Sequence, residues 1–275
     1  MNTNIIANND NNFSKNILIL GGADGIGFAI SKVYEKLNYN IYVTSRNNHK
    51  DSNNIKYFTL EATKENSWLD LKEKFKKDNI VFDIIINTIG ILHDEVNNIY
   101  PEKSIKNMDI NFFMKNIEIN SLVSALCIKH MIDFISKNKK TVIASLTARL
   151  GSISDNNIGG WLSYRASKAA QHMIIKTASI ELSRNYNKLI IIGLHPGTVS
   201  TKLSKPYIKS AKNVFEAEQS ANKLITVIDN LDYISYLQEK FLIIQEKLFL
   251  TKLKKLQQKK PQCIKKYNHR CKKYL

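Results

Sequence analysis

Two side chains with the chemistry of a proton-transfer pair, Tyr164 and Lys168, stand four residues apart. Both fall in a stretch that predicts a helix, so this spacing puts them on one face. A tyrosine hydroxyl is almost fully protonated at neutral pH, and a neighbouring lysine cation is expected to stabilise the phenolate and lower its pKa. Such a pair predicts a general acid for carbonyl reduction. The same spacing recurs at Tyr236 and Lys240, so the surrounding elements must decide which pair is functional.

Four of the ten glycines cluster where a short apolar strand gives way to a helical pattern, in the order Gly21-Gly22-Ala23-Asp24-Gly25-Ile26-Gly27. Residues without a Cβ let the backbone approach a pyrophosphate while the N-terminus of the next helix faces it. The pattern favours a dinucleotide site, with contacts expected from Gly21, Asp24, Gly25, Ile26 and Gly27. The alternative is a tight turn in which glycine serves close packing alone.

The type of dinucleotide is indicated at the end of the second predicted strand, where Ser45 and Arg46 stand. An acidic residue here would accept hydrogen bonds from the ribose hydroxyls of NAD, whereas an arginine suits the 2′-phosphate of NADP. Arg46 therefore favours NADP as the cofactor, with NAD possible. The alternative is an arginine that simply lies on the surface.

Apolar segments that predict strands alternate with segments that predict helices. We expect strands at 16–20, 41–45, 55–60, 82–87, 141–146 and 189–194, and helices at 28–37, 67–77, 114–130 and 161–186. Strands that are apolar along their whole length predict a parallel sheet covered by helices on both faces. The fold class is therefore α/β, a doubly wound (Rossmann-type) parallel sheet in a single domain with an atypical basic helical C-terminal tail.

In such a sheet, strand ends and helix starts border one crevice, where ligands bind. Tyr164 begins the helix that follows the fifth strand, and the glycines begin the helix that follows the first. Asn120 in the preceding helix and a hydroxyl at the end of the fifth strand, Ser145 or Thr147, are placed to reach the same crevice.

The chain divides into an Asn-rich leader at 1–15, a dinucleotide-binding and catalytic domain at 16–230 and a C-terminal extension at 231–275. The net charge is +17, and the last forty residues contribute ten of these charges, with 12 basic and 2 acidic residues. Apolar residues between Ile234 and Leu248 recur at spacings of three and four, which predicts an amphipathic helix. This helix either packs on the domain or contacts an anionic membrane or a partner, and nucleic-acid binding is unlikely because no recognition motif accompanies the charge.

Composition excludes several classes of protein. With 43% hydrophobic residues the chain is not intrinsically disordered, and no apolar run is long enough to span a membrane. The first residues do not resemble a secretory signal, so we expect a cytoplasmic protein. Three cysteines predict no disulfide framework, and six histidines far apart predict no metal site.

The chain resembles the short-chain dehydrogenases/reductases, and within them the C-factor-like subgroup. The motifs that carry the likeness span about residues 16 to 230; they are Gly21-x3-Gly25-Ile26-Gly27, Asn87-Thr88-Ile89-Gly90 with Ile91-Leu92-His93, Pro101-Glu102-Lys103-Ser104, Asn120, Gly151-Ser152-Ile153-Ser154-Asp155-Asn156, Gly159-Gly160-Trp161, Ser163-Tyr164-Arg165-Ala166-Ser167-Lys168 and His195-Pro196-Gly197-Thr198-Val199-Ser200-Thr201.

The resemblance implies a catalytic tetrad. Tyr164 is expected to donate or accept the proton, Lys168 to bind the nicotinamide ribose and lower the tyrosine pKa, and Asn120 to hold a water linked to that lysine. A strand-end hydroxyl orients the substrate carbonyl. The remaining cofactor contacts that it implies are Glu61 near the adenine, Asn87 and Gly90 after the central strand, and Pro196, Gly197 and Thr198 along the nicotinamide.

Some positions depart from the family pattern. Leu20 replaces a threonine, Glu61 replaces an aspartate, and Thr88-Ile89 replaces an Asn-Ala pair. The usual place of the catalytic serine is Ala148, whereas the C-factor-like pattern aligns Thr147 with the serine. We expect Thr147 to be the catalytic hydroxyl, with Ser145 or Ser152 as substitutes.

The expected function is an NADP-dependent oxidoreductase that reduces a small-molecule carbonyl or oxidises an alcohol and forms a homo-oligomer, as is usual in the family. The alternative is a dinucleotide-binding signalling or scaffold protein without turnover, which the altered serine position favours. The family usually closes its sheet with a seventh, glycine-rich strand, but this chain has no glycine after Gly197, which leaves the existence of that strand open.

Overall fold

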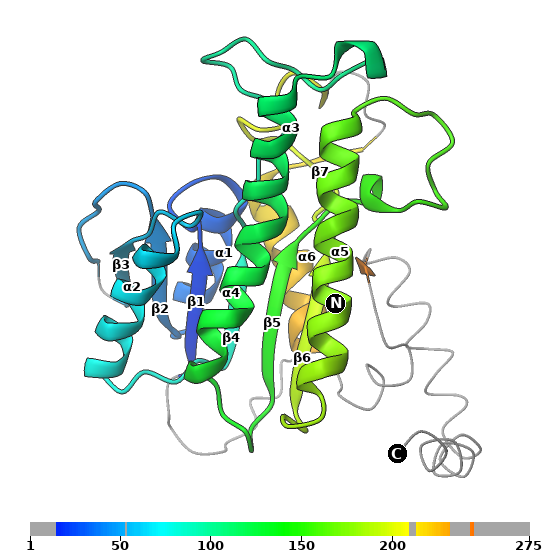
Figure 1. Ribbon diagram of the computed structural model, residues 1–275. Helices are drawn as coiled ribbons and strands as arrows, with labels where there is room; N and C mark the ends of the chain where they lie inside the picture. Colours follow the sequence, from blue (N-terminus) through cyan, green and yellow to red (C-terminus); the bar gives the residue numbers. More distant parts are fainter. Residues whose placement is uncertain (1–14, 53, 209–212, 232–242, 245–275) are drawn as a thin grey trace, which may run out of the picture.

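A parallel sheet forms the centre of the computed structural model, which describes residues 15–52, 54–208, 213–231 and 243–244 (Figure 1). The strand order is β3-β2-β1-β4-β5-β6-β9, and every neighbouring pair is parallel. The strands are β1 (Asn16–Leu20), β2 (Asn40–Ser45), β3 (Ile55–Thr59), β4 (Ile84–Asn87), β5 (Thr141–Leu146), β6 (Leu189–Leu194) and β9 (Ile243–Ile244). The chain enters at the middle, runs to one edge, returns and runs to the other, which confirms the doubly wound α/β prediction.

Helices cover both faces of this sheet (Figure 1). One face packs against α1 (Gly25–Lys36) and α6 (Ala217–Asp229). The other packs against α2 (Glu65–Lys77), α4 (Val123–Met131) and α5 (Leu162–Leu182). The central strands β4, β5 and β6 are buried along their whole length, as their apolar sequences predict.

The helix predicted at 114–130 consists of three pieces. It starts earlier, at α3 (Ile110–Asn116), because the Asp109 carboxylate caps it by accepting a hydrogen bond from the Phe112 N–H at 2.7 Å. A π-helical turn, η2 (Ile117–Leu122), then joins α3 to α4. Such turns concentrate at functional sites, and this one carries Asn120.

Short elements complete the described chain. The strands β7 (Thr198–Val199) and β8 (Val214–Phe215) form a separate two-stranded sheet. The 3₁₀ turns are η1 (Ile105–Asn107), η3 (Ile132–Phe134) and η4 (Arg149–Gly151). Among the described residues, no helix is long and apolar enough to cross a membrane.

The C-terminal extension differs from the prediction where it can be compared. Most of the amphipathic helix predicted between Ile234 and Leu248 lies outside the described residues. The two described residues, Ile243 and Ile244, form β9, paired with Gly193 and Leu194 of β6. The helix prediction is therefore wrong at these two residues, because their backbones pair with the edge of the sheet. This strand also answers the question of the seventh strand, in a short form without glycine.

Candidate active site

The glycine-rich loop joins β1 to α1 at the carboxyl edge of the sheet. Gly21 and Gly25 have φ of +74° and +53°, values that residues with a Cβ rarely adopt. A Cβ on Gly27 would lie 2.6 Å from the backbone oxygen of Gly21 and 2.7 Å from Oγ1 of Thr88. The loop is therefore tightly packed, and only glycine fits its last position.

The N-terminus of α1 opens on the same edge. Asp24 is its N-cap, and the carboxylate accepts a hydrogen bond from the Gly25 N–H at 2.5 Å. Chain neighbours and its own helix apart, a Cβ on Gly25 would meet nothing closer than Thr201 Cγ2 at 3.8 Å, so there is open space on that side of the residue. Helix N-termini of this kind attract anions such as a pyrophosphate.

Helix α5 buries an unusually polar face. Its buried residues recur at helical spacing and are Ser163, Ser167, Lys168, Gln171, His172, Ile175 and Ser179. This face lies against η2 and η4 and against β6. The polar groups of α5 therefore meet those of η2 and the end of β5 inside the molecule.

The Lys168 ammonium lies at the centre of this polar region. It donates hydrogen bonds to Oε1 of Gln171 at 3.0 Å and to the backbone oxygen of Leu146 at 3.3 Å. Burial lowers the pKa of Lys168 to about 7. The ammonium also lies 5.7 Å from the centre of the Tyr164 ring, as the four-residue spacing predicted.

Tyr164 lies in the first turn of α5 and is half-buried. Burial raises the pKa of its hydroxyl, the opposite of the shift expected from the lysine alone. The reason is that the same burial penalises both charges: it disfavours the phenolate and also lowers the pKa of Lys168. In this structure Tyr164 is therefore a protonated donor at neutral pH.

Asn120 closes the other side of the crevice. Its side-chain amide donates to the backbone oxygen of Ile91 at 2.9 Å and accepts from the Ile91 N–H at 2.8 Å. Further hydrogen bonds join it to Asn116 Oδ1 at 3.1 Å and Ser167 Oγ at 3.0 Å. A Cβ on Gly90 would lie 3.1 Å from Asn120 Oδ1 and 3.7 Å from Lys168 Nζ, so Gly90 lies between the two side chains.

The predicted hydroxyl, Thr147, is buried, and its Oγ1 lies 2.6 Å from Nε2 of His172. Burial, with a smaller contribution from the Lys168 charge, lowers the pKa of His172 to about 4, while a hydrogen bond to the Gly151 backbone raises it. A neutral histidine that donates to this backbone must accept at its other nitrogen, so the Thr147 hydroxyl donates to His172. Ser145 is buried in β5, and Ser152 turns to Ser154 Oγ at 3.3 Å.

Three other predicted residues lie along the same edge. Arg46 and Glu61 are exposed after β2 and β3. Asn87 ends β4, where its amide donates to Ser124 Oγ at 3.1 Å and accepts from the Ile89 N–H at 3.0 Å. The first bond ties β4 to α4, and the second fixes the turn that follows β4.

The segment Pro196-Gly197-Thr198 follows β6. Gly197 has φ of +82°, and a Cβ there would lie 2.9 Å from the Phe215 ring. The carbonyl of Pro196 accepts a hydrogen bond from Ser220 Oγ at 2.8 Å, which fixes the segment against α6. The structure thus brings the predicted residues to one edge of the sheet.

Sequence reasoning missed the partners of these groups, chiefly Gln171, His172, Ser167, Asn116 and Thr88. Helical spacing could have found two of them, because Gln171 and His172 lie three and four residues after Lys168 and share its face. The others depend on how α3 and η2 pack on α5.

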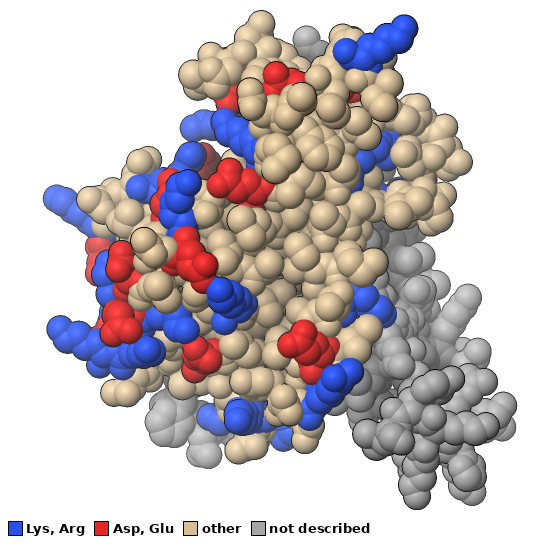
Figure 2. Space-filling view, in the orientation of Figure 1, with Lys and Arg blue, Asp and Glu red and all other residues tan. Residues whose placement is uncertain are grey.

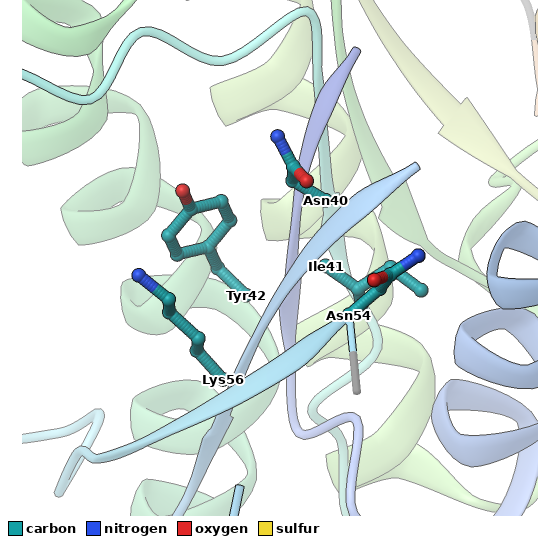
Figure 3. Close-up of a pocket in the computed structure, with 5 residues that line it drawn as sticks. All are labelled: Asn40, Ile41, Tyr42, Asn54 and Lys56. Carbon is teal, nitrogen blue, oxygen red and sulfur yellow. The ribbon is translucent and has the colours of Figure 1, made fainter. Parts of the chain in front are cut away.

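A small pocket of about 180 Å³ lies at the other end of the sheet (Figure 3). It is lined by Asn40, Ile41, Tyr42, Asn54 and Lys56, at the starts of β2 and β3. The Lys56 ammonium lies 5.9 Å from the centre of the Tyr42 ring. The pocket shares no residue with the crevice. Within the described part of the chain, no group of three or more His, Cys, Asp or Glu side chains could hold a metal ion.

Comparison with known proteins decides the family. The family model described as short chain dehydrogenase matches residues 15–212. The chain belongs to the short chain dehydrogenase family. This confirms the resemblance read from the motifs, and as a short chain dehydrogenase the chain is an oxidoreductase.

Related short chain dehydrogenases have varied names. The chain is 30% identical over 173 residues to the 1-hydroxy-2-glutathionyl-2-methyl-3-butene dehydrogenase of Rhodococcus sp., covering 62% of this chain and 70% of the relative. It is 27% identical over 150 residues to the C-signal protein of Myxococcus xanthus, covering 54% of this chain and 82% of that protein.

Solved structures share the fold. A short-chain dehydrogenase/reductase from Burkholderia multivorans with bound NADP has a TM-score of 0.68 at 20% identity, covering 78% of this chain and 90% of the other. The carbonyl reductase Sniffer of D. melanogaster has a TM-score of 0.69 at 19% identity, covering 80% and 93%.

Proposed function

We propose that this short chain dehydrogenase is an NADP-dependent carbonyl reductase or alcohol dehydrogenase in which Tyr164 transfers the proton. The observation that carries the proposal is that Lys168 lies between two other predicted residues: its ammonium is 5.7 Å from the centre of the Tyr164 ring, and it faces Asn120 across Gly90. The NADP-bound relative and the carbonyl reductase with the same fold support the same chemistry.

The residues at this edge fit a dinucleotide. The N-terminus of α1 and the open space beside Gly25 suit the pyrophosphate, with Gly21, Asp24, Ile26 and Gly27 completing the loop. Arg46 would hold the 2′-phosphate, with Glu61 near the adenine; Asn87, Gly90, Pro196, Gly197 and Thr198 would line the remaining length. When bound, the nicotinamide supplies or receives the hydride.

The side chains divide the remaining work. Tyr164 Oη donates its proton to the carbonyl oxygen during reduction and takes one back from the alcohol during oxidation. The Lys168 ammonium stabilises the phenolate that this transfer leaves and binds the nicotinamide ribose. Asn120 is held by four hydrogen bonds and fixes the backbone of Ile91 beside Gly90. Thr147, together with His172, orients the substrate, and Tyr164 donates the proton.

A second function, dinucleotide binding without turnover, is favoured by one observation. The Thr147 hydroxyl donates to His172, and the usual serine position holds Ala148. The hydrogen of the Thr147 hydroxyl is then not free to bind a substrate oxygen, which removes one of the two predicted catalytic hydroxyls.

Replacing Tyr164 by Phe separates the two functions. We expect turnover of carbonyl substrates with NADPH to fall by about 10²- to 10⁴-fold, because general acid catalysis is lost, while NADPH affinity measured by titration stays unchanged. The matched control is Tyr186→Phe, beyond the C-terminal end of α5. Equal rates for Tyr164→Phe and the unmodified chain would overturn the mechanism, and absence of turnover in the unmodified chain would favour binding alone.

The proposal extends to the whole chain. Residues 16–230 bind the cofactor and carry out the reaction. The basic segment at 231–275 has a separate role at anionic surfaces. The protein is proposed to act in the cytoplasm as a homo-oligomer on small carbonyl or alcohol substrates.

A further inference from the structure

Four aromatic side chains extend from the candidate catalytic tyrosine in a chain of ring contacts. The ring of Tyr164 meets that of Trp161 edge to face at 6.3 Å, and Trp161 meets Tyr207 at 5.0 Å. Tyr207 meets His93 at 5.7 Å, and His93 stacks on Tyr100 at 5.8 Å. We call Trp161, Tyr164, Tyr207, His93 and Tyr100 the aromatic array.

The array is assembled from three separate segments. His93 and Tyr100 follow β4, Trp161 and Tyr164 begin α5, and Tyr207 follows β7. All three segments lie beyond the carboxyl ends of the strands, at the top of Figure 1. Trp161, Tyr164 and Tyr207 are half-buried and Tyr100 is exposed, so the rings are not part of either core that packs on the sheet.

The backbone of Trp161 adopts an unfavourable conformation. Trp161 has φ of +55°, a left-handed conformation that is unfavourable for a bulky residue, and it follows two glycines that are also left-handed. A hydrogen bond from its N–H to the Glu102 carbonyl at 2.6 Å holds it there. A glycine or asparagine would end this turn without strain, and strained positions of this kind cluster at ligand sites.

The surroundings of the array have low polarity. Burial raises the pKa of the Tyr207 hydroxyl to about 12 and also raises that of Tyr164. The Glu95 carboxylate lies 3.3 Å from Nε2 of His93 at one end of the array, and the Lys168 ammonium lies 5.7 Å from the centre of the Tyr164 ring at the other. The side of the Tyr164 ring that meets Trp161 is therefore lined by aromatic rings, and Tyr207 extends this lining.

We propose that the crevice is built for an aromatic carbonyl compound or its alcohol, whose flat ring packs against Trp161 and Tyr207 while its oxygen meets Tyr164. This inference rests on the proposed function and names its substrate class. Edge-to-face and offset contacts between rings favour an aromatic ligand over a saturated one of equal size by about two- to tenfold for each pair.

The test compares substrates that differ only in the ring. Benzaldehyde and cyclohexanecarbaldehyde, then acetophenone and cyclohexyl methyl ketone, are assayed with NADPH and the full chain. We expect kcat/KM to be higher by about tenfold or more for the aromatic member of each pair. Most of this difference should come from a lower KM. In Trp161→Asn, which tolerates the left-handed backbone, and in Tyr207→Leu the preference should fall towards one, whereas Trp161→Phe and Tyr207→Phe should keep it.

A second measurement does not depend on turnover. The chain has two tryptophans, and Trp68 is fully buried at α2 with its indole N–H bonded to the Ala62 carbonyl. Benzyl alcohol without cofactor should therefore quench tryptophan fluorescence through Trp161, and cyclohexylmethanol should not. The quenching should disappear in Trp161→Phe.

The outcomes separate this inference from the proposed function. Turnover without an aromatic preference, or a preference that survives both Trp161→Asn and Tyr207→Leu, overturns the aromatic substrate class and leaves the function standing. Absence of turnover on all four carbonyls overturns the proposed function for these substrates, and the fluorescence measurement then decides the inference. Equal quenching by benzyl alcohol and cyclohexylmethanol counts against the aromatic substrate class.

Discussion

Lys168 places a titratable cation where water cannot reach it easily. Its pKa is about 7 in the folded chain, compared with 10.5 for an ordinary lysine. Between these two values the unfolded chain binds a proton that the folded chain does not, so the free energy of unfolding should rise with pH in this window by about 1.4 kcal/mol per pH unit. Below pH 7 both states carry the proton, and the cost of burying it is paid in full.

Replacing Lys168 by Met removes this dependence. The variant should gain stability relative to the unmodified chain near pH 7, and the gain should shrink as the pH approaches 10. Loss of the hydrogen bonds to Gln171 and Leu146 adds a cost that does not vary with pH. Urea unfolding at pH 7, 8, 9 and 10 measures the difference, with exposed Lys188→Met as control. A difference that stays constant over this range would show that Lys168 is charged in the folded state.

Arg46 determines cofactor choice if it holds the 2′-phosphate. Arg46→Asp should shift the preference from NADP towards NAD, because it removes a cation from the phosphate and supplies a carboxylate to the ribose hydroxyls. A charge-assisted contact contributes about 1.5–3 kcal/mol, which is roughly ten- to a hundredfold in NADP affinity. Titration of both dinucleotides checks this, and Lys50→Asp nearby serves as control. Unchanged affinity for both would remove Arg46 from the site.

At the scale of elements, the packing of α1 on the glycine-rich loop positions the cofactor. In Gly27→Ala the new methyl would lie 2.6 Å from a backbone oxygen that no side-chain rotation can move. We expect a loss of about 1–3 kcal/mol in stability and a marked loss of NADP affinity, since α1 must shift. Phe28→Ala, at an exposed position of the same helix, is the control for thermal unfolding and cofactor titration. Wild-type affinity in Gly27→Ala would show that the loop does not hold the pyrophosphate.

The sequence predicted those elements whose signal is local. Strands β5 and β6 have the predicted bounds because their residues are apolar throughout and buried on both faces. The π-helical turn at η2 was not predicted, because nothing in its residues distinguishes it from an α-helix. Ile244 was assigned to a helix because its spacing fits one, but pairing with β6 gives it a strand partner.

In the candidate active site, too, local features were predicted and features that depend on packing were not. Tyr164 and Lys168 were found because their spacing puts them on one helix face and that helix follows the fifth strand of the predicted sheet. The direction in which the pKa of Tyr164 shifts was not predicted, since it depends on burial by neighbours from other elements. Thr147 was chosen for its hydroxyl, but its donation to His172 depends on how α5 packs against β5.

At the scale of the whole molecule, one face is poor in charge. Figure 2 shows few charged side chains over α4 and α5, and the exposed apolar residues of this region include Leu122, Met173 and Ile180. A single chain rarely exposes a large apolar patch, so this face is where we expect the homo-oligomer to form. Met173→Glu should lower the mass measured by sedimentation, whereas Val96→Glu, exposed on a loop, should not. A monomeric unmodified chain would contradict the expectation.

We expect the basic C-terminal segment to contact anionic membranes. Ten basic and no acidic residues follow Thr251, while every proposed site residue precedes it. Charges are screened over about 8 Å at physiological salt, so a chain ending at Thr251 should bind NADP as the full chain does. It should lose co-sedimentation with anionic vesicles, because each basic residue near such a surface contributes about 1 kcal/mol. Equal vesicle binding by both chains would dismiss the membrane role, and weaker NADP binding would assign the segment to the folded domain.

The strand order has a consequence for how the protein is made. Strands β1, β2 and β3 pair with one another and are complete by Thr59, so one half of the sheet has all its members early in synthesis. The other edge of β1 must wait for β4, which starts at Ile84, 64 residues after β1 ends at Leu20. At about 5–20 residues per second, the ribosome leaves this apolar edge open for roughly 3 to 13 seconds. The nascent chain is therefore most exposed to wrong strand pairing before the centre of its sheet is closed.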